Sequence, residues 1–119
     1  MLLALASGGA QAAELVMFER AGCPWCRNWD REIAPIYPKT PEGARAPLRR
    51  VSLDQPLGPE WKLDPPVFYS PTFVVMDDGR EIGRITGYSN AESFWGLLSG
   101  IMRRIPPTKS GTGTTVTSP

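Results

Sequence analysis

Short runs of apolar, β-branched and aromatic residues recur between residues 14 and 85, and each is followed closely by glycine, proline or aspartate. Runs of this length and composition predict β-strands. The last two runs are separated by Asp77-Asp78-Gly79-Arg80, a turn sequence that predicts an antiparallel hairpin. The predicted strands are residues 14–19, 48–53, 72–76 and 81–85.

Two other segments carry apolar residues at helical spacing. The first begins at Pro24, a residue type favoured in the first turn of a helix, and predicts a helix over residues 24–37 with a kink at Pro35. The second follows the capping-box sequence Ser89-Asn90-Ala91-Glu92 and is predicted to end near Arg104. The expected apolar face of the first helix is Cys26, Trp29, Ile33 and Tyr37, and that of the second is Phe94, Leu97, Leu98, Ile101 and Met102.

Proline and glycine mark the connecting segments. Residues 38–47 are predicted to form a surface loop, and residues 56–66 an irregular segment with a helical turn near residues 60–63. Trp61 in this segment is interpreted as a lid over the core rather than as a ligand contact. The order strand, helix, strand, hairpin, helix predicts an α/β fold with a four-stranded mixed sheet and helices on both of its faces.

The 119 residues fit a single domain, and 13 Lys and Arg residues stand against 12 Asp and Glu residues. This balance gives no indication of nucleic-acid binding, and no apolar run approaches the roughly eighteen residues of a membrane span. The domain is predicted to cover residues 14–104. The following residues 105–119 are rich in Pro, Thr, Ser and Gly and are predicted to form a disordered tail.

The first thirteen residues resemble the end of a signal peptide. An apolar run leads into small residues and an A-x-A type cleavage site at Ala10-Gln11-Ala12, although the positively charged start of such a peptide is missing. On this interpretation residues 1–13 are a signal remnant, and the mature chain begins near Ala13 or Glu14 in an oxidising compartment such as the bacterial periplasm. The alternative interpretation is a frayed N-terminal tail.

The two cysteines of the chain, Cys23 and Cys26, directly follow the first predicted strand. Two thiols at this spacing form a disulfide and reopen it by thiol–disulfide exchange. Zinc sites need three or four protein ligands, and the chain has no His and no further Cys, so no metal site is predicted. A static structural disulfide is the other interpretation, although closing so small a loop stabilises a fold by only about 2 kcal/mol.

The place of Cys23 at the start of the predicted helix indicates its chemistry. Unpaired N–H groups and the positive end of the helix dipole favour a thiolate there and lower its pKa from the usual value near 8.5. Cys23 is therefore the predicted attacking thiol, and Cys26, one turn deeper on the apolar face, is the predicted resolving thiol. Pro24 and the flanking Arg20 and Arg27 are candidates for tuning the thiol pKa.

The ordered set of motifs resembles the thioredoxin superfamily over residues 14–104. The resemblance rests on four motifs. They are a strand that leads into Cys23-Pro24-Trp25-Cys26, the end of the second strand at Val51-Ser52-Leu53-Asp54-Gln55-Pro56, the start of the third at Ser70-Pro71-Thr72, and the hairpin at Asp78-Gly79.

The resemblance implies a thioredoxin-like fold and a set of client-binding residues. It implies that Pro71 is a cis-proline packed against the cysteine pair, although a proline before a strand is also compatible with ordinary strand entry. It also implies that Ser70 offers its backbone to a client peptide for strand-like pairing. Trp25, between the cysteines, is the third expected client contact.

Two departures from thioredoxin itself are visible in the sequence. Met17 occupies the position at which family members carry a buried aspartate that accepts the proton of the second thiol. Glu19 and Asp30 are candidate substitutes, with a solvated surface charge as the other interpretation of each. The pair Pro24-Trp25 is similar to the proline–aromatic pair of glutaredoxins, but the segment 38–47 and the expected export signal do not fit a glutaredoxin. Overall the chain resembles the exported thioredoxins of bacterial sulfur-oxidation operons.

The function that follows is a thiol–disulfide oxidoreductase that reduces disulfides of partner proteins outside the cytoplasm. Its expected redox group is the disulfide formed by Cys23 and Cys26, with no bound cofactor. The expected partners are a client protein disulfide and a membrane thiol donor or other redox partner, and the protein is expected to be a monomer. Two alternatives are a glutaredoxin-like, glutathione-dependent reductase and a redox-inert peptide-binding module that uses Trp25 and Pro71 and has a structural disulfide.

Overall fold

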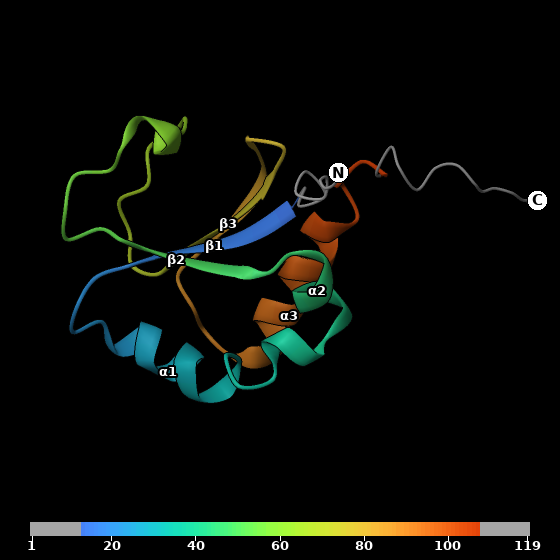
Figure 1. Cartoon of the computed structure of the whole chain (residues 1–119). Helices are drawn as coiled ribbons and strands as arrows, with labels where there is room; N and C mark the ends of the chain where they lie inside the picture. Colours follow the sequence, from blue (N-terminus) through green and yellow to red (C-terminus); the bar gives the residue numbers. More distant parts are fainter. Residues whose placement is uncertain (1–12, 108–119) are drawn as a thin grey trace, which may run out of the picture.

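Four strands form one mixed sheet in the computed structural model, which describes residues 13–107 (Figure 1). The strands lie in the order β2-β1-β3-β4. β1 pairs in parallel with β2, and the pairs β1–β3 and β3–β4 are antiparallel. The predicted α/β, thioredoxin-like fold with a four-stranded mixed sheet is therefore confirmed. The strands are β1 Ala13–Glu19, β2 Leu48–Ser52, β3 Thr72–Asp77 and β4 Arg80–Thr86.

The two central strands are buried on both faces because their side chains alternate between two cores. Leu15 and Met17 of β1 belong to the first core, which the helices cover. Val16 and Phe18 belong to the second core on the opposite face. This double burial explains why the sequences of β1 and β3 are continuous apolar runs instead of alternating ones.

The three α-helices found within residues 13–107 lie on the same face of the sheet (Figure 1). They are α1 Pro24–Glu32, α2 Pro41–Arg45 and α3 Ala91–Met102. The predicted helix over residues 24–37 is wrong in its length, because α1 ends at Glu32. Pro35 has no N–H to continue the helix, and the N–H groups of Ile33 and Ala34 both donate to the Trp29 carbonyl. The predicted apolar face is nevertheless buried: Cys26, Trp29, Ile33 and Tyr37.

The predicted loop over residues 38–47 is also wrong, since it contains a 3₁₀ turn, η3 Tyr37–Lys39, and the short helix α2. Thr40 starts α2 by accepting a hydrogen bond from the Gly43 N–H at 3.0 Å. Pro41 occupies the first helical position, where a missing N–H costs nothing. The prolines that indicated a loop are therefore the start signals of two short helical turns.

The second face of the sheet is covered by the segment 53–67 rather than by an α-helix, which corrects the expectation of helices on both faces (Figure 1). Its regular element is a 3₁₀ turn, η4 Pro59–Trp61. Trp61 is 9% exposed and packs edge-on against Phe18 with ring centroids 5.3 Å apart. The prediction that Trp61 is a lid over the core is confirmed.

The C-terminal helix differs in detail from its prediction. Asn90, and not the predicted capping box, caps α3 by accepting a hydrogen bond from the Ser93 N–H at 2.8 Å. Leu97 was expected on the apolar face but is 56% exposed, whereas the other four predicted residues are buried. Ile105 is buried in the first core, so packing extends one residue past the predicted domain boundary at Arg104.

No helix between residues 13 and 107 is both long and apolar enough to cross a membrane. The predicted signal remnant and the predicted disordered tail lie almost entirely outside the described residues. Ala13, the last residue of the predicted remnant, is buried as the first residue of β1.

Candidate active site

Cys23 and Cys26 are joined by a disulfide where β1 leads into α1, with their Cα atoms 5.2 Å apart. Cys23 is the N-cap residue of α1, and Pro24 follows in the first helical position. The backbone N–H of Cys26 donates to Cys23 Sγ at 3.1 Å. Both cysteines are buried, Cys23 at 8% and Cys26 at 4% exposure, so hydrogen bonding distinguishes the two sulfur atoms more clearly than exposure does.

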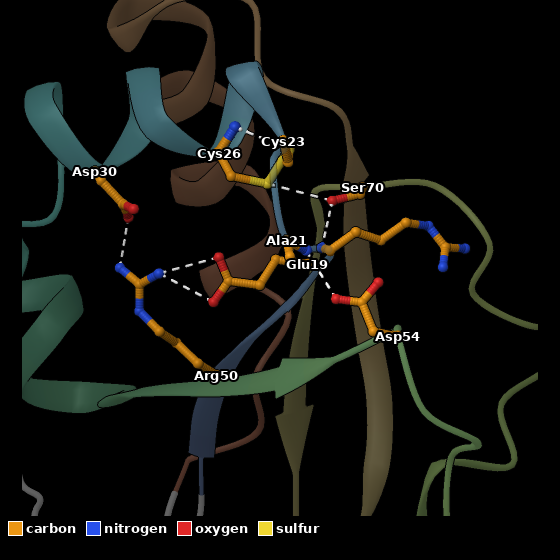
Figure 2. A network of polar contacts seen from close by, with 9 residues as sticks. Glu19, Ala21, Cys23, Cys26, Asp30, Arg50, Asp54 and Ser70 are labelled. Atoms are coloured by element: carbon orange, nitrogen blue, oxygen red, sulfur yellow. Dashed lines mark hydrogen bonds and ion pairs between the residues drawn. A yellow bond between two sulfur atoms is a disulfide. The ribbon is translucent and has the colours of Figure 1, made fainter.

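Ser70 lies against this disulfide, and Pro71 follows it directly before β3. The peptide bond between them is cis. Ser70 Oγ is 3.3 Å from Cys26 Sγ and accepts a hydrogen bond from the backbone N–H of Arg20 at 2.9 Å (Figure 2). The Pro71 carbonyl accepts a hydrogen bond from the Gly87 N–H at 2.7 Å, which ties the loop after β4 to the same region. The structure thus brings the end of β1, the start of α1 and the segment at Ser70 together around the two sulfur atoms.

The two flanking arginines differ in their surroundings. The Arg20 guanidinium donates to the backbone carbonyls of Leu53 and Phe68, each at 3.0 Å. Arg20 therefore joins the end of β1 to both loops around the disulfide. Arg27 is exposed on α1. The role of either side chain in tuning the cysteines stays a prediction.

A charged network lies beside the cysteines, and Arg50 is its centre (Figure 2). Arg50 Nη1 bonds both carboxylate oxygens of Glu19, at 3.1 and 3.0 Å, and Arg50 Nη2 bonds Asp30 Oδ1. Burial lowers the pKa of Arg50, but its hydrogen bonds to Asp30 and Glu19 outweigh burial and raise that pKa above its ordinary value. Met17 is fully buried, and the two carboxylates proposed as substitutes for an aspartate at its position are instead paired with Arg50.

Three large aromatic side chains next to the site are exposed: Trp25 at 56%, Phe68 at 65% and Tyr69 at 69%. Trp25 was predicted as a client contact, whereas sequence reasoning missed the other two. Both directly precede Ser70-Pro71, and two aromatic residues before this dipeptide were the available signal. Arg50 was missed as well, because nothing in its own strand indicates its partners on β1 and α1.

The disulfide is the group that can carry redox chemistry here. Within residues 13–107 there is no group of three or more His, Cys, Asp or Glu side chains placed to hold a metal ion. Neighbouring donors to each sulfur and an adjacent proline at a strand start can support thiol–disulfide exchange without a bound cofactor.

Comparison with solved structures identifies similar proteins. The periplasmic thioredoxin SoxS from Paracoccus pantotrophus, in its reduced form, is 43% identical over 77% of this chain and 97% of that chain, with a TM-score of 0.73. The thioredoxin of Fasciola hepatica is 26% identical over 80% of this chain and 83% of its own, with a TM-score of 0.58. Trxlp from Edwardsiella tarda EIB202, 21% identical over 75% of this chain and 84% of its own, has a TM-score of 0.61 and shows the fold alone.

No family model matches the sequence, and a search of curated proteins gives no significant match. The likeness to SoxS covers nearly the whole of that protein at 43% identity, and the cysteine pair lies at the start of α1. The chain therefore belongs to the thioredoxin family and is a thiol–disulfide oxidoreductase whose redox group is its own disulfide.

Proposed function

We propose that the protein reduces disulfide bonds of partner proteins outside the cytoplasm, with Cys23 as the attacking thiol. The observation that carries this proposal is the place of Cys23 at the N-cap of α1, where the Cys26 N–H points at its sulfur. In the dithiol form the same N–H and the helix dipole stabilise the Cys23 thiolate and lower its pKa below the usual value near 8.5.

The first step joins the protein to its client. The Cys23 thiolate attacks one sulfur of the client disulfide, forms the Cys23–client bond and breaks the client S–S bond. The departing client sulfur leaves as a thiolate and takes up a proton from water. Pro24 supports this step because it fixes the first turn of α1 without needing a hydrogen-bond acceptor.

The second step releases the client. Cys26 loses its proton, attacks Cys23 Sγ and breaks the Cys23–client bond, so that the second client sulfur leaves as a thiolate and is protonated. Two electrons have then passed from the dithiol to the client, and the disulfide seen in this structure is restored. A separate thiol donor, such as a membrane protein, must return the chain to its dithiol form.

The client is held beside the disulfide by backbone pairing at Ser70 and Pro71 and by contact with Trp25. Exposed aromatic rings next to a reactive disulfide favour a peptide partner, because they supply apolar contact area without a deep cavity. The protein acts as a monomer in this proposal. Support for an extracytoplasmic place comes from SoxS, which is periplasmic, and from the signal-like composition of residues 1–13.

Two single-cysteine variants test the proposal. We expect Cys23→Ser to abolish reduction of insulin disulfides, because it removes the attacking thiolate. We expect Cys26→Ser to accumulate a mixed disulfide between Cys23 and its client, because the release step is lost. Insulin turbidity measures the first outcome, and non-reducing electrophoresis of trapped complexes measures the second. In the native compartment, the same trapping identifies the client.

Two results would count against the proposal. One is a Cys23→Ser variant that reduces insulin as fast as the unaltered protein. The other is a mixed disulfide that forms between the client and Cys26 in the Cys23→Ser variant, while the Cys26→Ser variant traps no client on Cys23. A glutathionylated peptide offered as a parallel substrate separates protein-disulfide reduction from a glutaredoxin-like activity.

A further inference from the structure

Ser70 Oγ has two hydrogen-bond partners, and chemistry fixes the direction of both bonds. The backbone N–H of Arg20, 2.9 Å away, is only a donor, so Ser70 Oγ accepts that bond. Cys26 Sγ, 3.3 Å away on the other side, is part of a disulfide and carries no hydrogen. The Ser70 hydroxyl must therefore donate its hydrogen to Cys26 Sγ, and the Arg20 N–H polarises it in the donating sense.

The Ser70 hydroxyl donates to the sulfur atom of the more deeply buried cysteine. Cys26 is 4% exposed and packs in the first core, which also contains the fully buried Met17. Burial in apolar surroundings disfavours a thiolate, whereas a hydrogen bond to the charged form favours it. Cys23 Sγ accepts a hydrogen bond from the Cys26 N–H, and Cys26 Sγ accepts one from the Ser70 hydroxyl.

We propose that the side-chain hydroxyl of Ser70 stabilises the thiolate of Cys26 in the client-release step. This inference rests on the proposed function, and it gives Ser70 a role separate from backbone pairing with the client. The Cys26 proton leaves to water, and the Cys26 thiolate forms the bond to Cys23 Sγ. The bond between Cys23 and the client then breaks, and the client thiolate takes a proton from water. Ser70 keeps its own proton throughout.

The charged groups around the site lie on several elements. Glu19 of β1, Arg50 of β2 and Asp30 of α1 form one ion-paired network, and Arg20 and Arg27 flank the cysteines. The carboxylate of Asp54, after β2, accepts a hydrogen bond from the Ala21 N–H. A substitution at Ser70 removes none of these charges. A change in the pKa of Cys26 in Ser70 variants is therefore attributed to the hydroxyl and not to the charged network.

The test uses a Cys23→Ser background, in which Cys26 is the only thiol of the chain. The pH dependence of its alkylation by iodoacetamide gives the pKa of Cys26. Adding Ser70→Ala should raise this pKa by about one unit, which is about tenfold less thiolate near neutral pH. Adding Ser70→Thr, which keeps a hydroxyl, should restore the lower pKa. Adding Ser93→Ala, at an exposed serine of α3, should leave it unchanged.

A kinetic readout follows in the chain with both cysteines. A thiol of higher pKa is a stronger nucleophile once ionised, which offsets part of the lost thiolate. Client release should therefore slow by about threefold in Ser70→Ala. The variant should fold, because the Arg20 N–H that loses its acceptor is at an exposed residue and water can replace Ser70 Oγ.

An unchanged Cys26 pKa in Ser70→Ala would overturn the inference, and so would failure of Ser70→Thr to restore it. Neither result concerns the ability of Cys23 to attack a client. Failure of the proposed function appears separately, as insulin reduction by a Cys23→Ser chain with Ser70 intact.

Discussion

At the scale of single residues, three exposed aromatic side chains belong to the segments that form the disulfide site. Trp25, Phe68 and Tyr69 are each more than half exposed, although large aromatic residues normally lose most of their surface on folding. Trp25 follows the first residue of α1, and the other two come just before the cis peptide bond of Pro71. The proposed contact with a client protein would explain why these three rings keep their apolar surface exposed.

We expect Trp25→Ala to raise the KM for insulin about fivefold, because the client loses roughly 1 kcal/mol of apolar contact. The rate with a small aromatic disulfide should change much less, since such a substrate reaches Cys23 without covering the surrounding surface. Ile36→Ala provides the control, because Ile36 is also exposed but lies beyond the far end of α1. Equal losses with both substrates would argue against a client contact.

The sequence predicted part of this site and missed part of it for a physical reason. The two-residue spacing and the helix start identify Cys23 and Cys26 locally, since both signals lie within a few residues. Arg50 forms ion pairs with Glu19 and Asp30, which are 31 and 20 residues away in the chain. Only the parallel pairing of β1 with β2 and the packing of α1 bring these three charges together.

At the scale of elements, short capping signals decide how the chain between α1 and β2 is arranged. Thr40 and Pro41 start α2, and Tyr37 donates its hydroxyl hydrogen to the Ala46 carbonyl at 2.6 Å, which closes the segment against the core. Gly43 is buried where this segment turns back on itself. A Cβ placed on Gly43 would overlap the backbone carbonyl of Tyr37, and backbone cannot easily move aside.

We expect Gly43→Ala to lower the free energy of unfolding by about 2 kcal/mol, because the added methyl group displaces packed backbone. Gly96→Ala is the matched control. Gly96 lies within α3, and a Cβ there meets open space, so alanine should stabilise the protein by roughly 0.5–1 kcal/mol. Urea unfolding measures both changes, and a loss of stability in both variants would refute this account of Gly43.

At the scale of the whole molecule, two tyrosines tie the helices to the rest of the first core. Burial raises the pKa of Tyr37 above its ordinary value, and the nearby Glu42 adds to the rise. Burial also raises the pKa of Tyr88, together with the hydrogen bond that its hydroxyl donates to Glu32 and the charge of that carboxylate. Both side chains therefore stay neutral in the folded protein at pH values where the unfolded chain ionises.

We expect the stability of the protein to fall as the pH rises above about 10, the pKa of tyrosine in an unfolded chain. The stabilising contribution is fully present below that pH. Above it the unfolded state releases protons that the folded state keeps, so stability declines up to the raised pKa of the folded state. Thermal unfolding midpoints between pH 7 and 11 measure this decline.

The paired substitution Tyr37→Phe and Tyr88→Phe should lower the midpoint at neutral pH and flatten the alkaline decline. Tyr69→Phe, at an exposed tyrosine, should leave the decline as it is. If stability fell with the same slope in the unaltered protein, the doubly substituted variant and the Tyr69→Phe variant, groups other than Tyr37 and Tyr88 would cause the decline.

The sequence by itself determined the four strands, the start of α1 at Pro24 and the cysteine pair, because each depends on residues that are neighbours along the chain. Tertiary structure decided what covers the second face of the sheet and which groups contact each sulfur atom. Ser70 reaches Cys26 across 44 residues, and Trp61 reaches Phe18 across a similar stretch. Such contacts follow from how the strands pair and how the two cores fill, and the order of residues records them only indirectly.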